Sequence, residues 1–221
     1  MSSLPLRATP DVRAATLAVV SEASATDDFA TALLAALSRR PRSIAPKYFY
    51  DAAGSALFDR ICELPEYYPT RTELGLLRRH AREMAECVGA DAELVEFGAG
   101  SSLKVRLLLD ALQRPRRFVP IDISAEHLHA AAAQLHADYP ALEVAPLAAD
   151  FTRRVTLPPA VGRRVGFFPG SSIGNFEPDD ARRLLQRMTQ WLDGGLLIGV
   201  DLVKPEADLL LAYDDPLGVT A

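Results

Sequence analysis

The pattern of hydrophobic positions changes near residue 90 of this 221-residue chain. Before that point, apolar residues recur at helical spacing and predict two helical segments over 11–40 and a helix over 70–87. Pro41 and Pro46 end the first two helical segments, and an aromatic-rich segment that holds four of the six tyrosines lies between them and the helix over 70–87. Beyond residue 90, short apolar runs alternate with helical stretches, which indicates a different kind of structure.

The second part of the chain predicts a parallel sheet. Its apolar runs are AELVEFG, RFVPIDI, LEVAPLA, RVGFFPG and GLLIGVDLV, at 92–98, 117–123, 142–148, 164–170 and 195–203, with helical stretches at 103–113, 125–138 and 179–193. Short buried strands joined by helices are typical of an α/β fold in which helices cover both faces of the sheet. We therefore predict a helical, aromatic cap over 1–90 and an α/β core over 91–221.

Composition excludes several classes of protein. A net charge of -5 and a pI near 5.4 provide no basic surface for nucleic acid. No apolar run is long enough to cross a bilayer, and the first residues lack a signal-peptide pattern. We therefore expect a cytoplasmic protein that binds neither nucleic acid nor membrane. Cys62 and Cys87 lack metal-ligand spacing, so we expect two reduced, buried thiols and no metal site.

The residues that close the strands carry the candidate chemistry, because such sheets bind ligands beyond the carboxyl ends of their strands. Gly98 and Gly100 follow the first run, where glycines permit a tight turn and a close approach to a ligand. Asp122 follows the second run, 22 residues beyond Gly100, where a carboxylate can accept hydrogen bonds from ribose hydroxyls. Asp150 and Phe151 follow the third run, where they could contact an adenine. Together these features indicate a ligand that contains adenosine.

The third position of the glycine turn distinguishes two cofactors. A dinucleotide fingerprint requires a small residue there, so that the helix can approach and present its N-terminus to a pyrophosphate, but this chain has Leu103. The acidic Glu96, just before the glycines, suits a ligand with a sulfonium and an amino acid tail and without phosphates. We therefore favour S-adenosylmethionine over NAD, and a nicotinamide-dependent oxidoreductase remains the less favoured alternative.

Several longer blocks resemble those of the histidine-specific S-adenosylmethionine-dependent methyltransferases, the family that contains the ergothioneine-pathway histidine Nα-methyltransferase. The blocks are PKYFYDAAGSALFDRICELPEYYPTRTE, EFGAGSSLK, FVPIDIS, FFPGSSIGNFEP and GVDLVKPEADLLLAYDDPLGVTA, and the similarity runs from about residue 40 to the last residue. This resemblance implies a Rossmann-like class I methyltransferase core, with S-adenosylmethionine as cofactor and S-adenosylhomocysteine as product.

The resemblance also assigns roles to individual residues. It places Gly98, Gly100, Lys104, Asp122, Asp150 and Phe151 at the cofactor, and Tyr67, Gly170, Asn175 and Tyr213 at the amino acid substrate, with Tyr50 nearby. Asn175 and Tyr50 are the candidate catalytic residues. Phenol hydroxyls can donate to a carboxylate, and an amide oxygen can accept a hydrogen from an amine.

Each role has a structural alternative that the sequence leaves open. Tyr67 could pack against Tyr68, Asn175 could be a turn residue after a glycine, Tyr213 could pack along a helix, and Lys104 could be solvated.

By resemblance, the expected function is N-methylation of the α-amino group of an amino acid, with L-histidine as substrate and the trimethylated betaine as product. The alternatives are a fragment that binds the cofactor without turnover, and a methyltransferase of another amino acid or small amine. The family's last core strands and its imidazole-recognising extension have no counterpart in this sequence. We therefore expect an unpaired edge along GLLIGVDLV, through which the chain could associate.

Overall fold

The computed structural model of this protein describes residues 23–220, so the first helical segment predicted between 11 and 40 lies largely outside it. The helices are α1 (Ala23–Ser38), α2 (Ala52–Glu63), α3 (Tyr68–Val88), α4 (Leu103–Leu109), α5 (Ala125–Asp138), α6 (Pro178–Trp191) and α7 (Glu206–Tyr213). Two 3-10 turns are η1 (Pro46–Phe49) and η2 (Ser172–Asn175). The strands are β1 (Glu93–Phe97), β2 (Arg117–Asp122), β3 (Glu143–Val144), β4 (Leu147–Ala148), β5 (Arg164–Phe168) and β6 (Leu196–Ile198).

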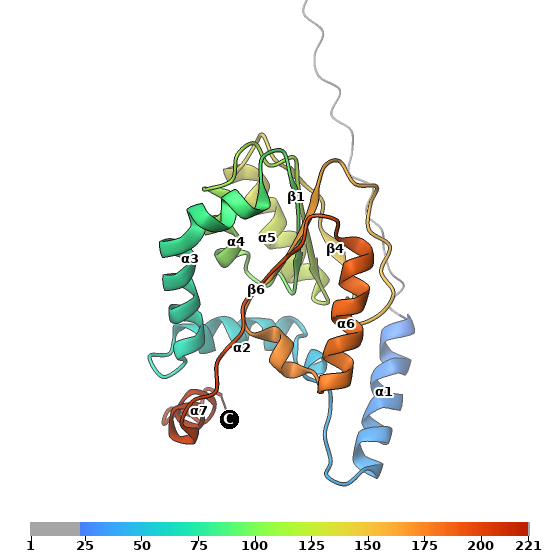
Figure 1. Cartoon of the computed structure of the whole chain (residues 1–221). Coiled ribbons are helices and arrows are strands. Elements are labelled where there is room, and N and C mark those ends of the chain that lie inside the picture. The colour runs from blue at the N-terminus through green and yellow to red at the C-terminus, as the bar shows by residue number, and fades with distance from the viewer. Residues whose placement is uncertain (1–22, 221) are drawn as a thin grey trace, which may run out of the picture.

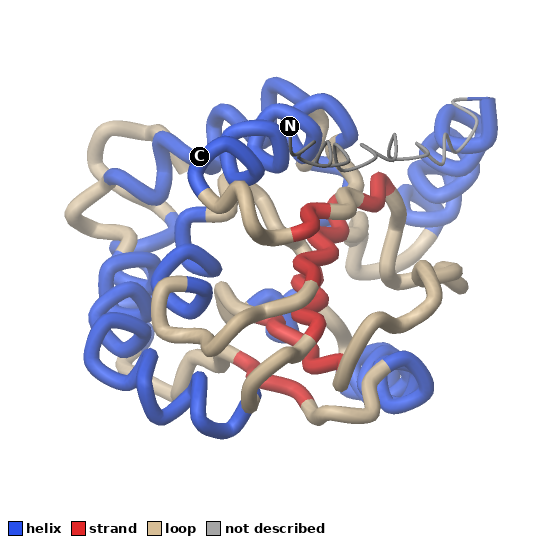
Figure 2. The backbone as a smooth tube through the Cα atoms, turned by 90° about the horizontal axis from the view of Figure 1, so that it is seen from above, coloured by secondary structure: helices blue, strands red, loops and turns tan. Residues whose placement is uncertain are grey.

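The strands form one parallel sheet, as the sequence predicted. Their order is β3-β2-β1-β5-β6, and β4 also pairs with β2. Figures 1 and 2 show the strands in the middle of the molecule, with helices around them. The chain builds outward from β1 through β2 to β3 and then returns to the other side of β1 as β5. This reversal marks the position, beyond the carboxyl ends of β1 and β5, at which open α/β sheets bind ligands. We refer to this position as the crevice.

Helices cover both faces of the sheet, because alternate side chains of each strand point to opposite sides. Leu94 of β1 packs into a core cluster with residues of α3, α4 and α5. Val95 and Phe97 of the same strand pack into a second cluster with α6. Figure 1 shows α3 and α4 on one side of the strands and α6 on the other. Each fully buried side chain of this size contributes about 1.5–3 kcal/mol of hydrophobic stabilisation.

The third predicted strand is divided in two. LEVAPLA was expected to form one strand, but it forms the short β3 and β4 with Ala145 and Pro146 between them. Proline has no backbone N–H and therefore interrupts a hydrogen-bond ladder.

The last strand is shorter than predicted. It ends at Ile198 instead of Val203, and the Gly199 N–H donates the final ladder bond to the Phe168 carbonyl at 2.9 Å. Pro169 then lacks a donor, and Gly170 turns the neighbouring chain away with a φ of +80°. Within the described residues β6 pairs with β5 alone, so its other edge is unpaired, and Val203 beyond it is exposed.

The predicted helices agree with the structure except for details and two omissions. Helix α5 has the predicted bounds, whereas α4 ends four residues early. Helix α2 was not predicted, and a helix at α7 was raised only as the structural alternative for Tyr213. Each carries a start signal: Asp51 accepts a hydrogen bond from the Gly54 N–H at 2.7 Å, and Pro205 precedes α7. Both cysteines are free, but the expected burial is wrong for both, since Cys62 is only partly buried and Cys87 is exposed. In the part of the chain that the structure describes, no helix combines the length and apolar character needed to cross a bilayer.

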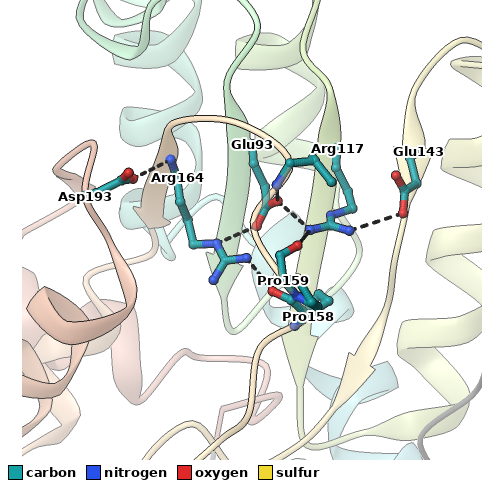
Figure 3. A network of polar contacts seen from close by, with 8 residues as sticks. Glu93, Arg117, Glu143, Pro158, Pro159, Arg164 and Asp193 are labelled. Carbon is teal, nitrogen blue, oxygen red and sulfur yellow. Dashed lines mark hydrogen bonds and ion pairs between the residues drawn. The ribbon is translucent and has the colours of Figure 1, made fainter.

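A buried ion network joins the amino ends of three strands (Figure 3). The Glu93 side chain is fully buried at the start of β1, and its Oε1 and Oε2 accept from Arg164 Nε at 2.5 Å and Arg117 Nη2 at 2.6 Å. Each arginine also donates to one proline carbonyl, Arg164 to that of Pro158 and Arg117 to that of Pro159. The network therefore fixes β1, β2 and β5 to the loop before β5, at the end of the sheet opposite the crevice.

Candidate ligand site at the carboxyl ends of the strands

The glycine turn after β1 contacts the carboxylate after β2. Gly98 and Gly100 have φ values of +76° and +49°, a region that favours glycine. The Gly100 N–H donates to Asp122 Oδ2 at 3.1 Å, and Asp122 Oδ1 accepts from the Ser124 N–H at 3.0 Å. Two features that the sequence singled out separately therefore form one wall of the crevice.

Asp150 lies after β4 and pairs with the N-terminal part of the chain. Its Oδ2 is 2.7 Å from Lys47 Nζ in η1, and its Oδ1 accepts from the Thr152 N–H at 2.9 Å. Burial raises the pKa of Asp150, but the hydrogen bonds from Lys47 and Thr152 outweigh burial and hold the pKa below its usual value. Asp150 is therefore an ionised carboxylate at neutral pH. Sequence reasoning missed Lys47, whose position inside the PKYFYD block was the available signal.

Phe151 packs mainly against the core. Its ring lies edge-on to Phe97 and Phe168, with centroid distances of 6.0 and 5.8 Å. The ring also approaches the glycine turn, since a Cβ added at Gly98 would be 3.8 Å from Phe151 Cε1. Phe151 therefore borders the turn at which the cofactor was predicted.

Lys104, in the first turn of α4, points to a carboxylate of α3. Its Nζ is 2.7 Å from Glu73 Oε2, and the Gly170 N–H donates to both oxygens of the same carboxylate. The structural alternative of a solvated Lys104 does not apply, since its side chain is only 20% exposed. Glu73 was missed by the sequence analysis, because nothing in the helical pattern of α3 distinguishes it from the other acidic residues of that helix.

Glu96 lies fully buried near this ion pair. Burial holds the pKa of Glu96 well above its usual range, although the charge of Lys104 opposes the shift. Its Oε2 has no hydrogen-bond partner among the described residues. Because burial favours the neutral carboxyl, this oxygen can take part in a hydrogen bond but is a weak source of negative charge for a sulfonium.

The predicted substrate tyrosines form an aromatic cluster across the crevice. Ring centroids are 5.6 Å apart for Tyr50 and Phe58, 6.1 Å for Phe58 and Tyr67, and 5.7 Å for Tyr67 and Tyr213. Tyr67 is buried against Tyr213, whereas Tyr68 donates to Asp201 Oδ2 at 2.5 Å. The alternative in which Tyr67 packs against Tyr68 therefore does not describe this cluster.

Electrostatic effects link the tyrosines to the glycine-turn side. Burial raises the pKa of Tyr67, and the nearby Tyr213 adds to the rise. Burial also raises the pKa of Tyr50, and the neighbouring charges of Cys62, Asp122 and Tyr213 raise it further. Both phenols therefore remain hydrogen-bond donors at physiological pH. Asp122 and Tyr213 thus both contribute to the raised pKa of Tyr50.

Asn175 ends η2, the turn that follows β5. Gly170 and Ser171, which lead into η2, both have positive φ values, and the Gly174 N–H donates to the Ser171 carbonyl at 2.8 Å. Asn175 is exposed, and no hydrogen bond joins its side chain to another described residue. Its amide is therefore available to a ligand, although no contact brings it to the tyrosines.

The donor set fits S-adenosylmethionine better than a dinucleotide. Helix α4 begins with the half-exposed Leu103, and Ser102 before it has a φ of +56°, so the turn lacks the open glycine-rich approach that a pyrophosphate requires. Asp122 and Asp150 are the carboxylates that could accept hydrogen bonds from a ribose and an adenine, and Lys104 is the cation that could pair with a carboxylate tail.

Comparison with known proteins agrees with this geometry. Residues 29–221 match the family model described as "Histidine-specific methyltransferase, SAM-dependent". The chain is 47% identical over 192 residues to a histidine N-alpha-methyltransferase of Mycolicibacterium smegmatis, a match that covers 85% of this chain and 60% of the relative. A protein of the same name from Mycobacterium tuberculosis is 46% identical, with 84% and 59% covered. The chain thus spans about 60% of the length of these relatives.

A solved structure supports the fold alone. A Thermobifida fusca protein, provisionally described as a methyltransferase, superimposes with a TM-score of 0.50 at 20% identity, covering 76% of this chain and 67% of that one.

Proposed function

Because this chain belongs to the histidine-specific, S-adenosylmethionine-dependent methyltransferases, we propose that it methylates the α-amino nitrogen of an amino acid, with L-histidine as the substrate. The family's cofactor is S-adenosylmethionine. The proposed product is the trimethylated betaine, formed in ergothioneine biosynthesis, a pathway for which further relatives are named.

One observation carries the proposal: Lys104 on the proposed cofactor side and the Gly170 N–H on the proposed substrate side contact the same carboxylate, with Lys104 Nζ 2.7 Å from Glu73 Oε2 and the Gly170 N–H donating to Glu73 Oε1 at 2.8 Å. A methyl donor held at the glycine turn would therefore lie beside an amino acid held at Gly170. Placing the reacting atoms side by side can supply much of the rate enhancement of such a transfer.

The side chains suit these roles. Tyr67 and Tyr213 donate hydrogen bonds to the substrate carboxylate without adding charge, and the Asn175 oxygen accepts one from the amine. When bound, S-adenosylmethionine supplies an electrophilic methyl group on a positive sulfonium. The low-dielectric pocket favours the neutral amine beside that charge, so a dedicated strong base is not required. Gly170, Ser171 and Ser172 are small and leave room for repeated methylation.

The proposal extends to the organisation of the chain. The N-terminal part over 1–90 acts as a cap that supplies Tyr50 and Tyr67 to the substrate side, and the Lys47–Asp150 ion pair supports this closure. Two free thiols suit the reducing cytoplasm, where we place the protein. The free edge of β6 and the exposed apolar residues after it favour association through that edge.

A mixture experiment tests the function directly. The chain is incubated with S-adenosylmethionine and all the amino acids, and methylated products are identified by mass spectrometry. Mono-, di- and trimethylated histidine are the expected products. Methylation of a different amino acid would contradict the substrate. Binding of S-adenosylhomocysteine without any methylated product would indicate a cofactor-binding fragment.

The raised phenol pKa values predict a flat pH dependence of product binding. A phenol donates its proton in a hydrogen bond below its pKa and loses that proton as the pH rises through the pKa. The pKa values of Tyr50 and Tyr67 both lie above 10, so both donors remain at lower pH. Trimethylated histidine is a suitable probe, because its quaternary nitrogen has no proton to lose. Its affinity, measured by calorimetry, should stay constant from about pH 8 to pH 10. A loss of affinity with a midpoint below pH 10 would contradict the assignment of these phenols as donors.

A further inference from the structure

Glu73 connects two parts of the crevice that otherwise belong to different strands. It lies in the second turn of α3, and its side chain is 17% exposed. The Gly170 N–H donates to its Oε1 at 2.8 Å and to its Oε2 at 3.0 Å. Lys104 Nζ lies 2.7 Å from Oε2. One carboxylate therefore forms an ion pair with a lysine side chain and accepts a hydrogen bond from a backbone N–H at the same time.

The two partners of Glu73 follow neighbouring strands. Lys104 comes after the glycine turn of β1, and Gly170 comes directly after β5. Since β1 and β5 are adjacent at the point where the strand order reverses, Glu73 spans the crevice at its centre. In the proposed reaction Lys104 binds the cofactor and Gly170 lies at the amino acid substrate.

Backbone packing leaves this carboxylate little freedom. A Cβ added at Gly199, just after β6, would be 2.1 Å from Glu73 Oε1, so the chain passes directly against the carboxylate. A Cβ added at Gly170, where φ is +80°, would be 3.2 Å from Lys104 Nζ. The positive φ therefore favours glycine at Gly170, and the Gly199 backbone passes close to the carboxylate.

We propose that Glu73 is a positioning residue that couples cofactor binding to amino acid binding, by holding the Lys104 ammonium and the Gly170 turn in one arrangement. This inference rests on the proposed function for the identity of the two ligands. Without the carboxylate, a largely buried ammonium loses its charge partner and the Gly170 N–H loses its acceptor. Either ligand that orders this cluster also orders it for the other, which is the physical basis of positive coupling.

The test compares two substitutions on the same helix. Glu73→Gln keeps the size of the side chain but removes its charge. Glu83→Gln removes the same charge at a position that is 76% exposed and contacts only His80. For each protein, the affinity for S-adenosylhomocysteine is measured by calorimetry with and without saturating L-histidine, and thermal denaturation confirms that it is folded.

The expected result is specific to Glu73. In the unsubstituted chain, histidine should tighten S-adenosylhomocysteine binding at least about fivefold. Glu73→Gln should weaken the binding of each ligand roughly tenfold. It should also bring the factor by which histidine tightens S-adenosylhomocysteine binding close to one. Glu83→Gln should change neither the affinities nor this factor. If Glu73→Gln does not fold, Glu73→Asp serves instead: it keeps the charge but is too short to reach both partners, and it should reduce the coupling partially.

Several outcomes would overturn the inference. Unchanged coupling in Glu73→Gln or Glu73→Asp, or independent binding of the two ligands to the unsubstituted chain, would remove Glu73 from this role. A chain that couples both ligands but methylates nothing would contradict the proposed function alone, because the coupling measurement requires no turnover. A chain that binds neither ligand would contradict both.

Discussion

Replacement of Glu93 by alanine is expected to lower the free energy of unfolding by about 3–5 kcal/mol. The carboxylate is fully buried and neutralises Arg117 and Arg164, which are themselves buried. Removing it leaves two guanidinium groups in a low-dielectric site without their shared counter-charge. Because small domains are stable by only about 5–15 kcal/mol, such a loss would leave much of the chain unfolded at moderate temperature.

Equilibrium denaturation in urea measures this loss, and the same network supplies the control. Glu143 also pairs with Arg117, at 3.4 Å, but its side chain is 57% exposed. Glu143→Ala should therefore cost less than about 1 kcal/mol. Equal effects of the two substitutions would show that the buried carboxylate contributes no more than a surface ion pair. A smaller total cost when Glu93, Arg117 and Arg164 are all replaced by apolar residues would show that the penalty arises from unpaired charge.

Replacement of Asn175 by alanine is expected to reduce kcat/KM for methyl transfer by about a hundredfold or more. In the proposed site the amide oxygen accepts a hydrogen bond from the substrate amine. This hydrogen bond orients the lone pair of the amine nitrogen toward the methyl group. Loss of that hydrogen bond removes both binding energy and orientation. The affinity for S-adenosylhomocysteine should stay within about twofold of its original value, because Asp122, Lys104 and the glycine turn remain intact.

Kinetics with histidine, combined with calorimetry of S-adenosylhomocysteine binding, separates these effects. Gln190→Ala is the matched control, since it removes an amide from an exposed position of the neighbouring helix α6 and should leave both quantities unchanged. Unchanged turnover in Asn175→Ala would leave that residue as a turn former only. A parallel loss of S-adenosylhomocysteine affinity would instead indicate that η2 supports the cofactor side.

The elements of the core and the residues at their ends could be predicted from the sequence. Alternating apolar runs predicted the parallel strands and the burial of both faces, because period and length are local properties of the chain. The spacing from Gly100 to Asp122 predicted two features that the structure brings into contact at 3.1 Å. Where a local rule was overlooked, as with Pro146 inside the third strand or Pro205 before α7, the error was also local.

The pairing of the charged residues, in contrast, depends on the folded arrangement of the chain. Lys47 and Asp150 are 103 residues apart, Glu73 and Gly170 are 97 apart, and Glu93 and Arg164 are 71 apart. The periodicity of the sequence cannot predict such pairs. They depend on the order of the strands across the sheet and on how α3 and η1 pack over the carboxyl ends of those strands. Many carboxylates in the sequence are equivalent by pattern. Burial and a fixed partner distinguish Glu73, Asp150 and Glu93 from the others, and both arise from the folded arrangement alone.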